Sequence, residues 1–491
     1  MKILVKIFAV LFVLSSCSGN SDIEVFVTDE VINKGYLGNG VEWDPYDEAG
    51  HWGNALSESD WEKLYQRMDF MRPGYVRCMI NSPFRYFDSS TGKYERTRNA
   101  ASLLTLLDYC QKNGVYVVYG EYNPPTWEMK DSEEWVKMSV DYLNWLVNEK
   151  GYDCIKQFVI FNEPDGNWSS VNGNYSFWLS MAERFYAEMS NYEGLTDKVK
   201  LAGPDVVMGY RNKAPEYDAE GWVAAAAKDI DSKIGLYDVH SYPGQKMVRS
   251  GEYAERLRSM RSKVPADKKI ILGESGYKYQ SDPADSLLWK EYLKRCQGHP
   301  YTKGSDCNML VYDYFYGIDM PLLAMEAMNN GFSGLAAWML DDAMHSNGDS
   351  GKTEDIKIWG MWNILGEEVF GDASQEEIRP WYYTWALMCR YFPKGSDIVK
   401  INMPEYAGVK LAAAVKDDGI TVAAVNFSEK EYNLSINLPK SLTDGILYRY
   451  EEDNIKVNSN GLPTPAKIEV KGSEMKINLA AQTFVLLTDM K

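Results

Sequence analysis

The chain has 491 residues, enough for two domains if one of them is an α/β barrel of about 250 residues. Hydrophobic residues make up 45% and charged residues 25% of the chain. These globular values exclude a disordered chain, a collagen-like chain and a protein with many membrane spans. Lys and Arg number 52 against 70 Asp and Glu, and the resulting net charge of −18 argues against a nucleic-acid partner.

The first residues form a targeting signal. Two lysines flank a short apolar run, residues 7–14, and the sequence Leu14-Ser15-Ser16-Cys17 overlaps its end. This order is typical of a secretory signal, and the run is too short to span a bilayer. The tetrapeptide resembles the bacterial lipobox, which implies removal of residues 1–16 and lipid attachment at Cys17. We expect a lipid-anchored protein of the bacterial cell envelope, at the outer membrane. A plain secretory signal with an incidental cysteine is the alternative.

Seven cysteines minus the lipidated one leave six. An exported chain can oxidise them, and six cysteines allow fifteen pairings. Cys296 and Cys307 bracket a loop-like stretch and form the candidate local disulfide. We expect Cys78, Cys110 and Cys154, which lie in or beside apolar segments, to be buried thiols. No cysteine or histidine spacing is typical of zinc.

Short apolar segments alternate with helical patterns over residues 36–393. Eight β-type segments separated by helices predict a (β/α)₈ TIM barrel. The predicted strands are Leu37–Glu42, Tyr75–Met79, Tyr116–Tyr119, Phe158–Phe161, Lys200–Ala202, Tyr237–His240, Ile270–Leu272 and Gly334–Trp338. The predicted helices are Glu58–Met71, Ala101–Asn113, Glu133–Glu149, Tyr175–Asn191, Ala219–Ala227, Tyr253–Lys263, Met320–Asn330 and Pro380–Tyr391.

The pattern changes after the barrel, and residues 394–491 read as a C-terminal all-β sandwich. Its segments are short, mostly alternate apolar and polar residues, and are separated by turns. They are Val409–Val415, Ile420–Phe427, Tyr432–Leu438, Ile446–Tyr450, Ala466–Val470, Met475–Leu479 and Phe484–Leu487. Ahead of the barrel, residues 17–35 combine a tether with a strand-like segment, Ile23–Val27, that could join the sandwich.

Two glutamates directly follow predicted barrel strands, at the end where such barrels place their catalytic groups. The fourth strand runs into Asn162-Glu163-Pro164 and the seventh into Gly273-Glu274-Ser275. Retaining glycoside hydrolysis needs such a pair, one as nucleophile and the other as an acid with a raised pKa. Either glutamate alone could be a solvated loop residue, but the pair in matching positions is far more specific.

With these motifs the chain resembles clan A of the glycoside hydrolases, whose acid/base follows strand four and whose nucleophile follows strand seven. Asn162-Glu163-Pro164 is the most specific element, and Arg77 matches the clan's strand-two arginine near the nucleophile. Tyr237–Pro243 and Gly203-Pro204-Asp205 look like segments of family 39. There is some likeness to families 30 and 5. The resemblance implies that Glu163 is the acid/base and Glu274 the nucleophile.

Neighbouring side chains then acquire expected roles. Asn162 is expected to donate to the sugar 2-hydroxyl. Arg77 is expected to keep Glu274 ionised, and Tyr242 to orient it. His240 could bond the substrate or a neighbouring side chain. The structural alternatives are a barrel ion pair for Arg77 and a core histidine for His240.

Three tryptophans near strand ends are candidate sugar platforms. Trp338 matches the clan's subsite platform, while Trp43 and Trp168 follow the first and fourth strands. Each taken singly is more often a core residue.

Residues 341–345, with two aspartates and a histidine, could be read as metal ligands. Substrate bonding or a solvated loop explains them better, and we expect neither a metal nor a cofactor.

The sequence thus predicts a lipid-anchored retaining β-glycosidase that acts on oligo- or polysaccharides, with a carbohydrate substrate, a membrane contact through Cys17 and no nucleic-acid partner. The two carboxyl groups should lie about 5–5.5 Å apart. Two alternatives remain. One is a non-catalytic glycan-binding lipoprotein on a degenerate barrel, and the other is a transglycosylase with the same catalytic residues.

Overall fold

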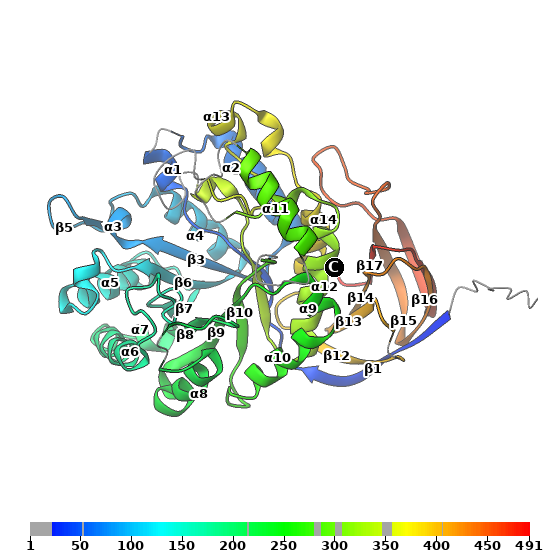
Figure 1. Cartoon of the computed structure of the whole chain (residues 1–491), viewed down its shortest axis with the longest axis horizontal. Coiled ribbons are helices and arrows are strands. Elements are labelled where there is room, and N and C mark those ends of the chain that lie inside the picture. The colour runs from blue at the N-terminus through cyan, green and yellow to red at the C-terminus, as the bar shows by residue number, and fades with distance from the viewer. Residues whose placement is uncertain are drawn as a thin grey trace, which may run out of the picture.

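A computed structural model of the chain describes residues 22–51, 54–213, 216–278, 286–299, 307–345, 356–404 and 406–491. Residues 1–16, which we expect to be a signal, and Cys17 lie outside this part. A closed barrel and a second, separate sheet lie side by side, and the chain passes from the first into the second (Figure 1).

The eight predicted strands are all present, and they close into a parallel barrel with every predicted neighbour in place. Side chains alternate along each strand, so that one set fills the barrel and the other packs under the helices. Tyr75, Val118, Val159 and Ile271 belong to the inner set. The strands are β2 (Gly38–Glu42), β3 (Tyr75–Asn81), β6 (Tyr116–Asn123), β7 (Ile155–Val159), β8 (Lys200–Val207), β9 (Ile234–Ser241), β10 (Ile270–Ser275) and β11 (Gly334–Ala337).

Helices cover the outside of the barrel, and side-chain caps start several of them. Ser57, Ser132 and Asp218 each accept a backbone N–H of the first turn that follows. The long helices are α2 (Glu58–Met71), α4 (Ala101–Asn113), α5 (Glu133–Asn144), α6 (Tyr175–Met189), α8 (Ala219–Asp229), α10 (Glu252–Arg261), α11 (Ser286–Gly298), α12 (Tyr316–Asn329) and α14 (Trp381–Tyr391). Shorter elements are α1 (Asp47–His51), α3 (Ser82–Arg85), β4 (Phe87–Asp88), β5 (Lys93–Tyr94), α7 (Leu195–Lys198), α9 (Gln245–Arg249) and α13 (Gly366–Phe370).

The C-terminal sheet has seven strands around its own hydrophobic core. Its longest strand, β15, has 19 residues and takes in two segments that the sequence predicts as separate strands. The first part of β15 pairs with β16 on one side and with β1 on the other, and its last part pairs with β17. Through β1, the strand therefore links the two ends of the sheet order. The strands after the barrel are β12 (Asp397–Asn402), β13 (Val409–Lys416), β14 (Gly419–Asn426), β15 (Tyr432–Tyr450), β16 (Lys467–Leu479) and β17 (Thr483–Thr488).

The N-terminal strand β1 (Asp22–Asn33) belongs to this same sheet. It pairs antiparallel with β12 and parallel with β15. Ile23, Val25 and Val27 are buried in the sandwich core, whereas Phe26 is half-exposed. The first described residues therefore lie in the domain that ends the chain.

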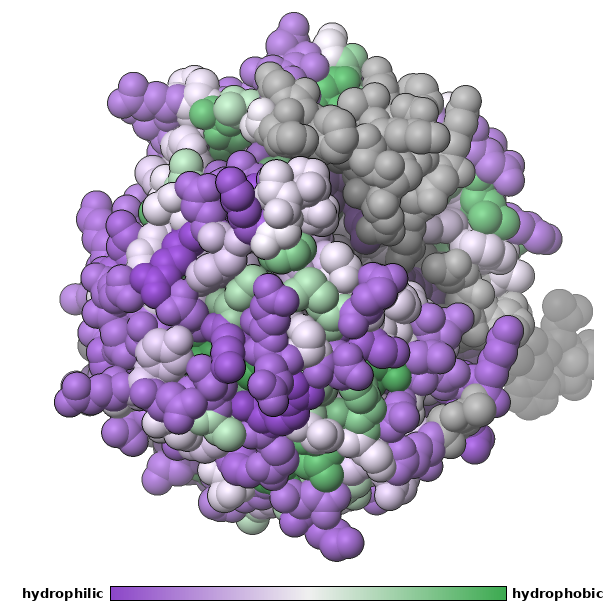
Figure 2. Space-filling model, turned by 90° about the vertical axis from the view of Figure 1, so that its left-hand side faces the viewer, coloured by the Kyte–Doolittle hydropathy of each residue, from purple (hydrophilic) through white to green (hydrophobic). Residues whose placement is uncertain are grey.

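The face of the barrel seen in Figure 2 is mostly hydrophilic, with small separated hydrophobic areas. Within the described residues, no helix has both the length and the apolar character needed to cross a membrane.

Candidate active site

The C-terminal ends of the barrel strands carry a ring of functional side chains, one from each strand or from the segment that follows it. On β3, β6 and β9 the inward direction follows the alternation of the strand. Register shifts interrupt the alternation at Asp205 on β8 and just before Glu274 on β10. The ring consists of Glu42 (β2), Arg77 (β3), Tyr122 (β6), Glu163 (after β7), Asp205 (β8), His240 (β9), Glu274 (β10) and Trp338 (after β11).

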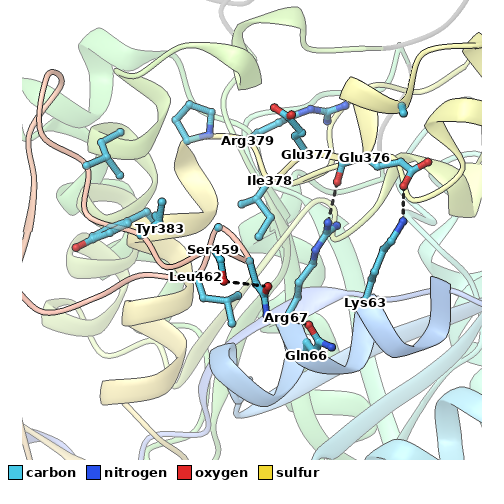
Figure 3. Close-up of a pocket in the computed structure, with 16 residues that line it drawn as sticks. Lys63, Gln66, Arg67, Glu376, Glu377, Ile378, Arg379, Tyr383, Ser459 and Leu462 are labelled. Atoms are coloured by element: carbon cyan, nitrogen blue, oxygen red, sulfur yellow. Dashed lines mark hydrogen bonds and ion pairs between the residues drawn. The ribbon is translucent and has the colours of Figure 1, made fainter. Parts of the chain in front are cut away.

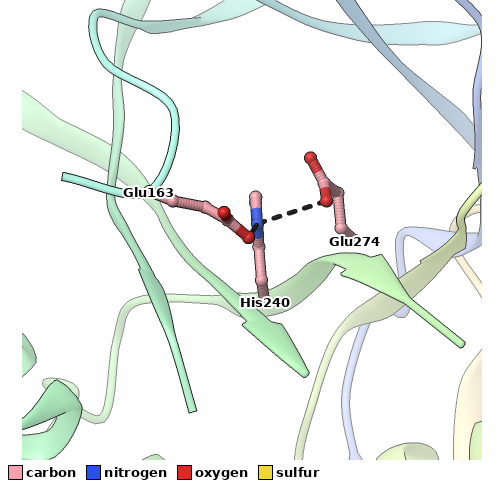
Figure 4. Close-up of side chains that lie close together, drawn as sticks. All are labelled: Glu163, His240 and Glu274. Carbon is pink, nitrogen blue, oxygen red and sulfur yellow. Dashed lines mark hydrogen bonds and ion pairs between the residues drawn. The ribbon is translucent and has the colours of Figure 1, made fainter. Parts of the chain in front are cut away.

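The two predicted catalytic glutamates meet in this ring, with His240 between them (Figure 4). The closest carboxylate oxygens of Glu163 and Glu274 lie within 4.8 Å of each other. Nδ1 of His240 lies 2.9 Å from Oε1 of Glu163 and 3.5 Å from Oε2 of Glu274. Retaining glycosidases hold their carboxyl groups about 5–5.5 Å apart, and inverting enzymes about 6.5–9.5 Å. The spacing is therefore of the shorter kind.

Arg77 is fully buried and joins four side chains through its two terminal nitrogens. Nη1 donates to Oε1 of Glu274 at 2.6 Å and to both oxygens of Glu42 at 2.9 and 3.0 Å. Nη2 donates to Oδ1 of Asn162 at 2.7 Å and to Oδ2 of Asp205 at 3.0 Å. Burial lowers the pKa of Arg77, but these carboxylates more than offset it and raise the pKa well above its usual value. The guanidinium thus fixes Glu274 and turns the amide oxygen of Asn162 inward, leaving its NH₂ group for another acceptor.

Tyr242 holds the other oxygen of Glu274, as the sequence predicts. Its hydroxyl donates to Oε2 of Glu274 at 2.8 Å. The ring packs edge-on against Trp359 at a centroid distance of 5.7 Å, and Nζ of Lys278 lies 4.6 Å from the ring centroid. With Arg77 on Oε1 and Tyr242 on Oε2, both oxygens of Glu274 have a fixed donor.

The pKa of Glu163 is lowered in the free protein, whereas the sequence-based expectation was a raised one. Burial would raise this pKa, but the hydrogen bond and charge of His240 outweigh it, with smaller contributions from Lys278 and Trp168. Nε1 of Trp168 donates to Oε2 of Glu163 at 2.6 Å. The expectation is wrong for the free state because donors and positive charge surround this carboxylate and favour its ionised form.

His240 contacts neighbouring side chains on both ring nitrogens. Nδ1 faces Glu163, and Nε2 lies 3.2 Å from Oδ1 of Asp205. Burial lowers the pKa of His240, but the charges of Glu274 and Asp205 outweigh that and raise it well above the usual value. Of the two roles considered for this histidine, the structure shows bonding to neighbours.

Two of the three candidate tryptophans lie at the site. Trp168 is 46% exposed, bonds Glu163 and packs edge-on against Tyr210. Trp338 follows β11, and its ring centroid lies 5.5 Å from that of His345. It is almost buried, at 7% exposure.

The prediction that Trp43 contacts substrate is wrong. Trp43 follows Glu42 on β2, and adjacent strand residues face opposite sides. Glu42 points into the barrel and bonds Arg77, so Trp43 points outward to the helices. It is completely buried and packs edge-on against Tyr109 of α4 at 5.5 Å.

Sequence reasoning missed Glu42 and Asp44, which belong to a second set of polar groups beside the glutamates. It did single out His345, of the same set, as part of residues 341–345. Asp44 accepts a hydrogen bond from the hydroxyl of Tyr122 at 2.6 Å, and Nε2 of His345 lies 3.0 Å from the same oxygen. The hydroxyl of Tyr122 also reaches Glu42 at 3.3 Å. Asp205 was noted only as part of a family-like segment. Alternation alone does not say which of two adjacent residues faces inward, and the structure shows that Glu42 and Tyr122 do.

The aspartates after β11 are structural and fully buried, so the expectation of substrate bonding or a solvated loop is wrong for them. Asp341 accepts from the backbone of Ala343 and Ile364 and from the indole of Trp362. Asp342 accepts from Arg379 and from two backbone N–H groups. Both carboxylates brace the connection between β11 and α14.

Two sets of side chains in the ring have spacing that could hold an ion. They are Glu163, His240 and Glu274, and Asp205, Asp238 and His240. Arg77 already donates to Glu274 and to Asp205, however, and supplies the positive charge that an ion would bring.

The sulfurs of Cys296 and Cys307 lie 3.1 Å apart, in contact but beyond the roughly 2.05 Å of a disulfide bond.

A cavity of about 600 Å³ lies away from the ring, where barrel helices meet the sandwich (Figure 3). Arg67 and Lys63 of α2 reach across to Glu376, bonding its carbonyl at 2.8 Å and its carboxylate at 2.6 Å. Ser459 and Leu462 line the sandwich side. None of the ring residues lines this cavity, so it is separate from the catalytic glutamates.

Comparison with known proteins places the fold. No family model matches the chain, and no curated protein matches its sequence. Solved structures do match. A family 30 endoxylanase from Clostridium papyrosolvens C71 is 15% identical with a TM-score of 0.60, and the match covers 95% of this chain and 99% of that one. A family 39 β-xylosidase from Caulobacter crescentus is 10% identical with a TM-score of 0.59, covering 95% and 99%.

A family 51 α-L-arabinofuranosidase from Thermotoga petrophila RKU-1 is 13% identical with a TM-score of 0.61, covering 95% of this chain and 100% of that one. At such identities the likeness concerns the fold. The chain therefore has the fold of clan A glycoside hydrolases, barrel and sandwich together, as the sequence motifs indicate.

Proposed function

We propose that this protein is a retaining glycoside hydrolase that cleaves β-glycosidic bonds by double displacement. The observation that carries the proposal is the pair Glu163 and Glu274, whose closest oxygens lie within 4.8 Å at the C-terminal end of the barrel. That proximity supports direct attack by one carboxylate, as in retaining enzymes. The matched solved structures, glycoside hydrolases by their descriptions, share the fold.

Glu274 is the proposed nucleophile because Arg77 and Tyr242 hold both of its oxygens in place. A held carboxylate loses little freedom when it attacks the anomeric carbon. Glu163 is the proposed acid/base. It gives a proton to the leaving oxygen in the first step and takes one from water in the second. The NH₂ group of Asn162, turned away from Arg77, is the donor for the sugar 2-hydroxyl.

The experiment that tests this function is hydrolysis of a panel of nitrophenyl β-glycosides, followed by NMR of the released sugar. A retaining hydrolase first releases the β-anomer. Release of the α-anomer contradicts the proposed mechanism. Sugar binding without any turnover favours the non-catalytic alternative, and glycosyl transfer to an added alcohol in preference to water favours a transglycosylase.

We further propose that Cys17 carries the lipid anchor that tethers the enzyme to the bacterial cell envelope. The supporting observations are the Leu14-Ser15-Ser16-Cys17 motif and its position five residues before the start of β1 at Asp22. A tether this short holds the sandwich, to which β1 belongs, close to the membrane surface.

A further inference from the structure

The ring of His240 has a carboxylate on each nitrogen. Nδ1 lies 2.9 Å from Oε1 of Glu163 and Nε2 lies 3.2 Å from Oδ1 of Asp205. A neutral imidazole has a single N–H group and can donate to one of them. The other carboxylate would then need a proton of its own. An imidazolium donates to both at once, and its side chain here is fully buried.

The charges around His240 favour the imidazolium. Five carboxylates and one cation interact electrostatically with it. The carboxylates are those of Glu163 after β7, Asp165 in the loop that follows, Asp205 on β8, Asp238 on its own strand β9 and Glu274 on β10, and the cation is Arg77 on β3. Arg77 is shared among Glu42, Glu274 and Asp205. Burial raises the pKa of Asp165 to about 7 and that of Asp238 to about 8, so these two carry less than a full negative charge near neutral pH. The three carboxylates nearest the ring, Glu163, Asp205 and Glu274, still outnumber the single charge of Arg77.

We propose that the one proton the reaction uses rests on His240 in the free enzyme, and that His240 delivers it through Nδ1 to Glu163 when the leaving group departs. Asp205 is the positioning residue that orients the ring and holds the proton there. This inference rests on the proposed function and adds the source of the catalytic proton to it.

The proton balance is as follows. In the first step the Nδ1–H bond of His240 breaks and an O–H bond forms on Glu163. Glu163 passes that proton to the glycosidic oxygen as its bond to the anomeric carbon breaks, and a carboxylate oxygen of Glu274 bonds that carbon. His240 and esterified Glu274 are then neutral while Glu163 is ionised. The three groups together carry one negative charge before and after this step.

The second step reverses the transfer. Glu163 takes a proton from the attacking water while the ester bond to Glu274 breaks. The returning charge on Glu274, 3.5 Å from Nδ1, attracts the proton back to His240. The charge of Glu274 thus determines whether His240 is protonated. In the intermediate Glu274 is an ester without charge, so it no longer stabilises the imidazolium.

The contacts of Asp205 hold the ring of His240 in its orientation. Its Oδ1 faces His240, while Oδ2 accepts from Nη2 of Arg77 at 3.0 Å and from the backbone N–H of Glu163 at 3.4 Å. Its backbone adopts a left-handed φ of 65°, directly after Pro204. It touches no position where substrate would react, so it acts through His240.

The test measures the protonation of His240 directly. Histidine-selective ¹⁵N labelling of the free protein gives signals from its four histidines, and a His240→Gln variant assigns the one in question. We expect His240 to be doubly protonated at pH 7 in the wild type and neutral in an Asp205→Asn variant. Asp229→Asn on α8 is the matched control and should leave the signal unchanged. A neutral His240 in the wild-type protein at pH 7 overturns the inference, as does an unchanged His240 in Asp205→Asn.

A second measurement follows the proton through the reaction. The enzyme is treated with 2,4-dinitrophenyl 2-deoxy-2-fluoro-β-D-xyloside and the matching glucoside, which trap a glycosyl-enzyme. The ¹⁵N signal of His240 should then become that of a neutral ring, and a ring that stays doubly protonated overturns the delivery step. If neither these two probes nor the fluorosugar that matches the glycoside hydrolysed in the panel labels the protein, the proposed function fails. The free-protein spectrum still decides the resting place of the proton.

Kinetics of the Asp205→Asn variant give an independent readout. Loss of the charge beside Nε2 should move the basic limb of kcat/KM down by about one pH unit. The kcat for a poor leaving group should fall at least about tenfold more than that for dinitrophenyl glycosides, with little change in KM. A variant that loses activity equally for all leaving groups at an unchanged pH profile contradicts the positioning role.

Discussion

Trp168 donates its indole N–H to Oε2 of Glu163 at 2.6 Å. The donor comes from the loop directly after the glutamate, and the indole is 46% exposed. The proposed acid/base is therefore held by a residue whose side chain is itself half-exposed.

The Trp168→Phe variant tests what this bond does. The bond favours the carboxylate and helps to lower the pKa of Glu163, so its loss should raise that pKa. Glu163 must be ionised to accept a proton from water. The acidic limb of kcat for a dinitrophenyl glycoside, whose second step limits turnover, should therefore move to higher pH. Trp61→Phe on α2 is the control, and an acidic limb that stays in place would contradict the role.

The two glutamates should fail in different ways when each is changed to alanine. Glu274→Ala removes the nucleophile, so no glycosyl-enzyme should form from any substrate. Glu163→Ala removes the proton donor, which a dinitrophenolate leaving group does not need. This variant should keep a burst of dinitrophenol and lose cleavage of natural oligosaccharides. A burst from Glu274→Ala with none from Glu163→Ala would show that the roles are reversed.

Trp43 should matter for stability and not for chemistry. Its side chain is fully buried against Tyr109, and truncating a buried tryptophan to alanine costs about 3–5 kcal/mol. Urea unfolding of Trp43→Ala should show a loss of this size. The folded fraction should keep the wild-type KM for an aryl glycoside. A large rise in KM with little loss of stability would instead indicate that Trp43 contacts the substrate.

Asp238 should make the fold less stable as the pH rises. Burial, followed by the charge of Asp205, raises the pKa of Asp238 to about 8, and no described side chain or backbone group donates to its oxygens. An unfolded aspartate titrates near about 3.9. The free energy of unfolding should therefore be fully supported below about pH 4 and should fall as the pH rises through about 8. Asp238→Asn should flatten this slope in urea titrations and Asp229→Asn should not. Equal slopes in wild type and Asp238→Asn would contradict the assignment.

Cys17 should carry lipid in the mature protein. The wild-type chain should partition with membranes, and Cys17→Ser should lose its acyl anchor. Mass spectrometry of the N-terminus gives the decisive reading, since an unmodified mature N-terminus is incompatible with the proposal. Cys307→Ser is a control that leaves the signal intact.

Much of the barrel could be predicted because its parallel strands are buried on both faces. Such strands read as short apolar runs and stand out between longer helical patterns. Helix α2 was predicted with the bounds it has, since Ser57 and Asp60 form a capping box at its start. The continuity of β15 was missed because Pro439 and Gly445 read as a turn. Register shifts against β16 let the strand pass through them.

Site residues that directly follow a strand could be predicted from the sequence. Site residues whose side-chain direction depends on the backbone geometry of the strand could not. Glu163 and Glu274 are found from position alone. The choice between Glu42 and Trp43 depends on which of two adjacent residues faces inward, and the sequence shows no reason to prefer either. Asp205 follows Gly203-Pro204, where the alternation of β8 breaks, so its direction could not be deduced.

The pairing of β1 with β12 and β15 has a consequence for how the protein acquires its structure. Phe26 pairs with Asn402 and with Asn437, so β1 finds its partners only after the whole barrel has been made. Closing so long a loop is slow, because its entropy must be lost before the contacts form. A barrel that folds first would bring the two ends together, leaving the sandwich to close last. Until then β1 is a strand with both edges unpaired, open to pairing with another chain.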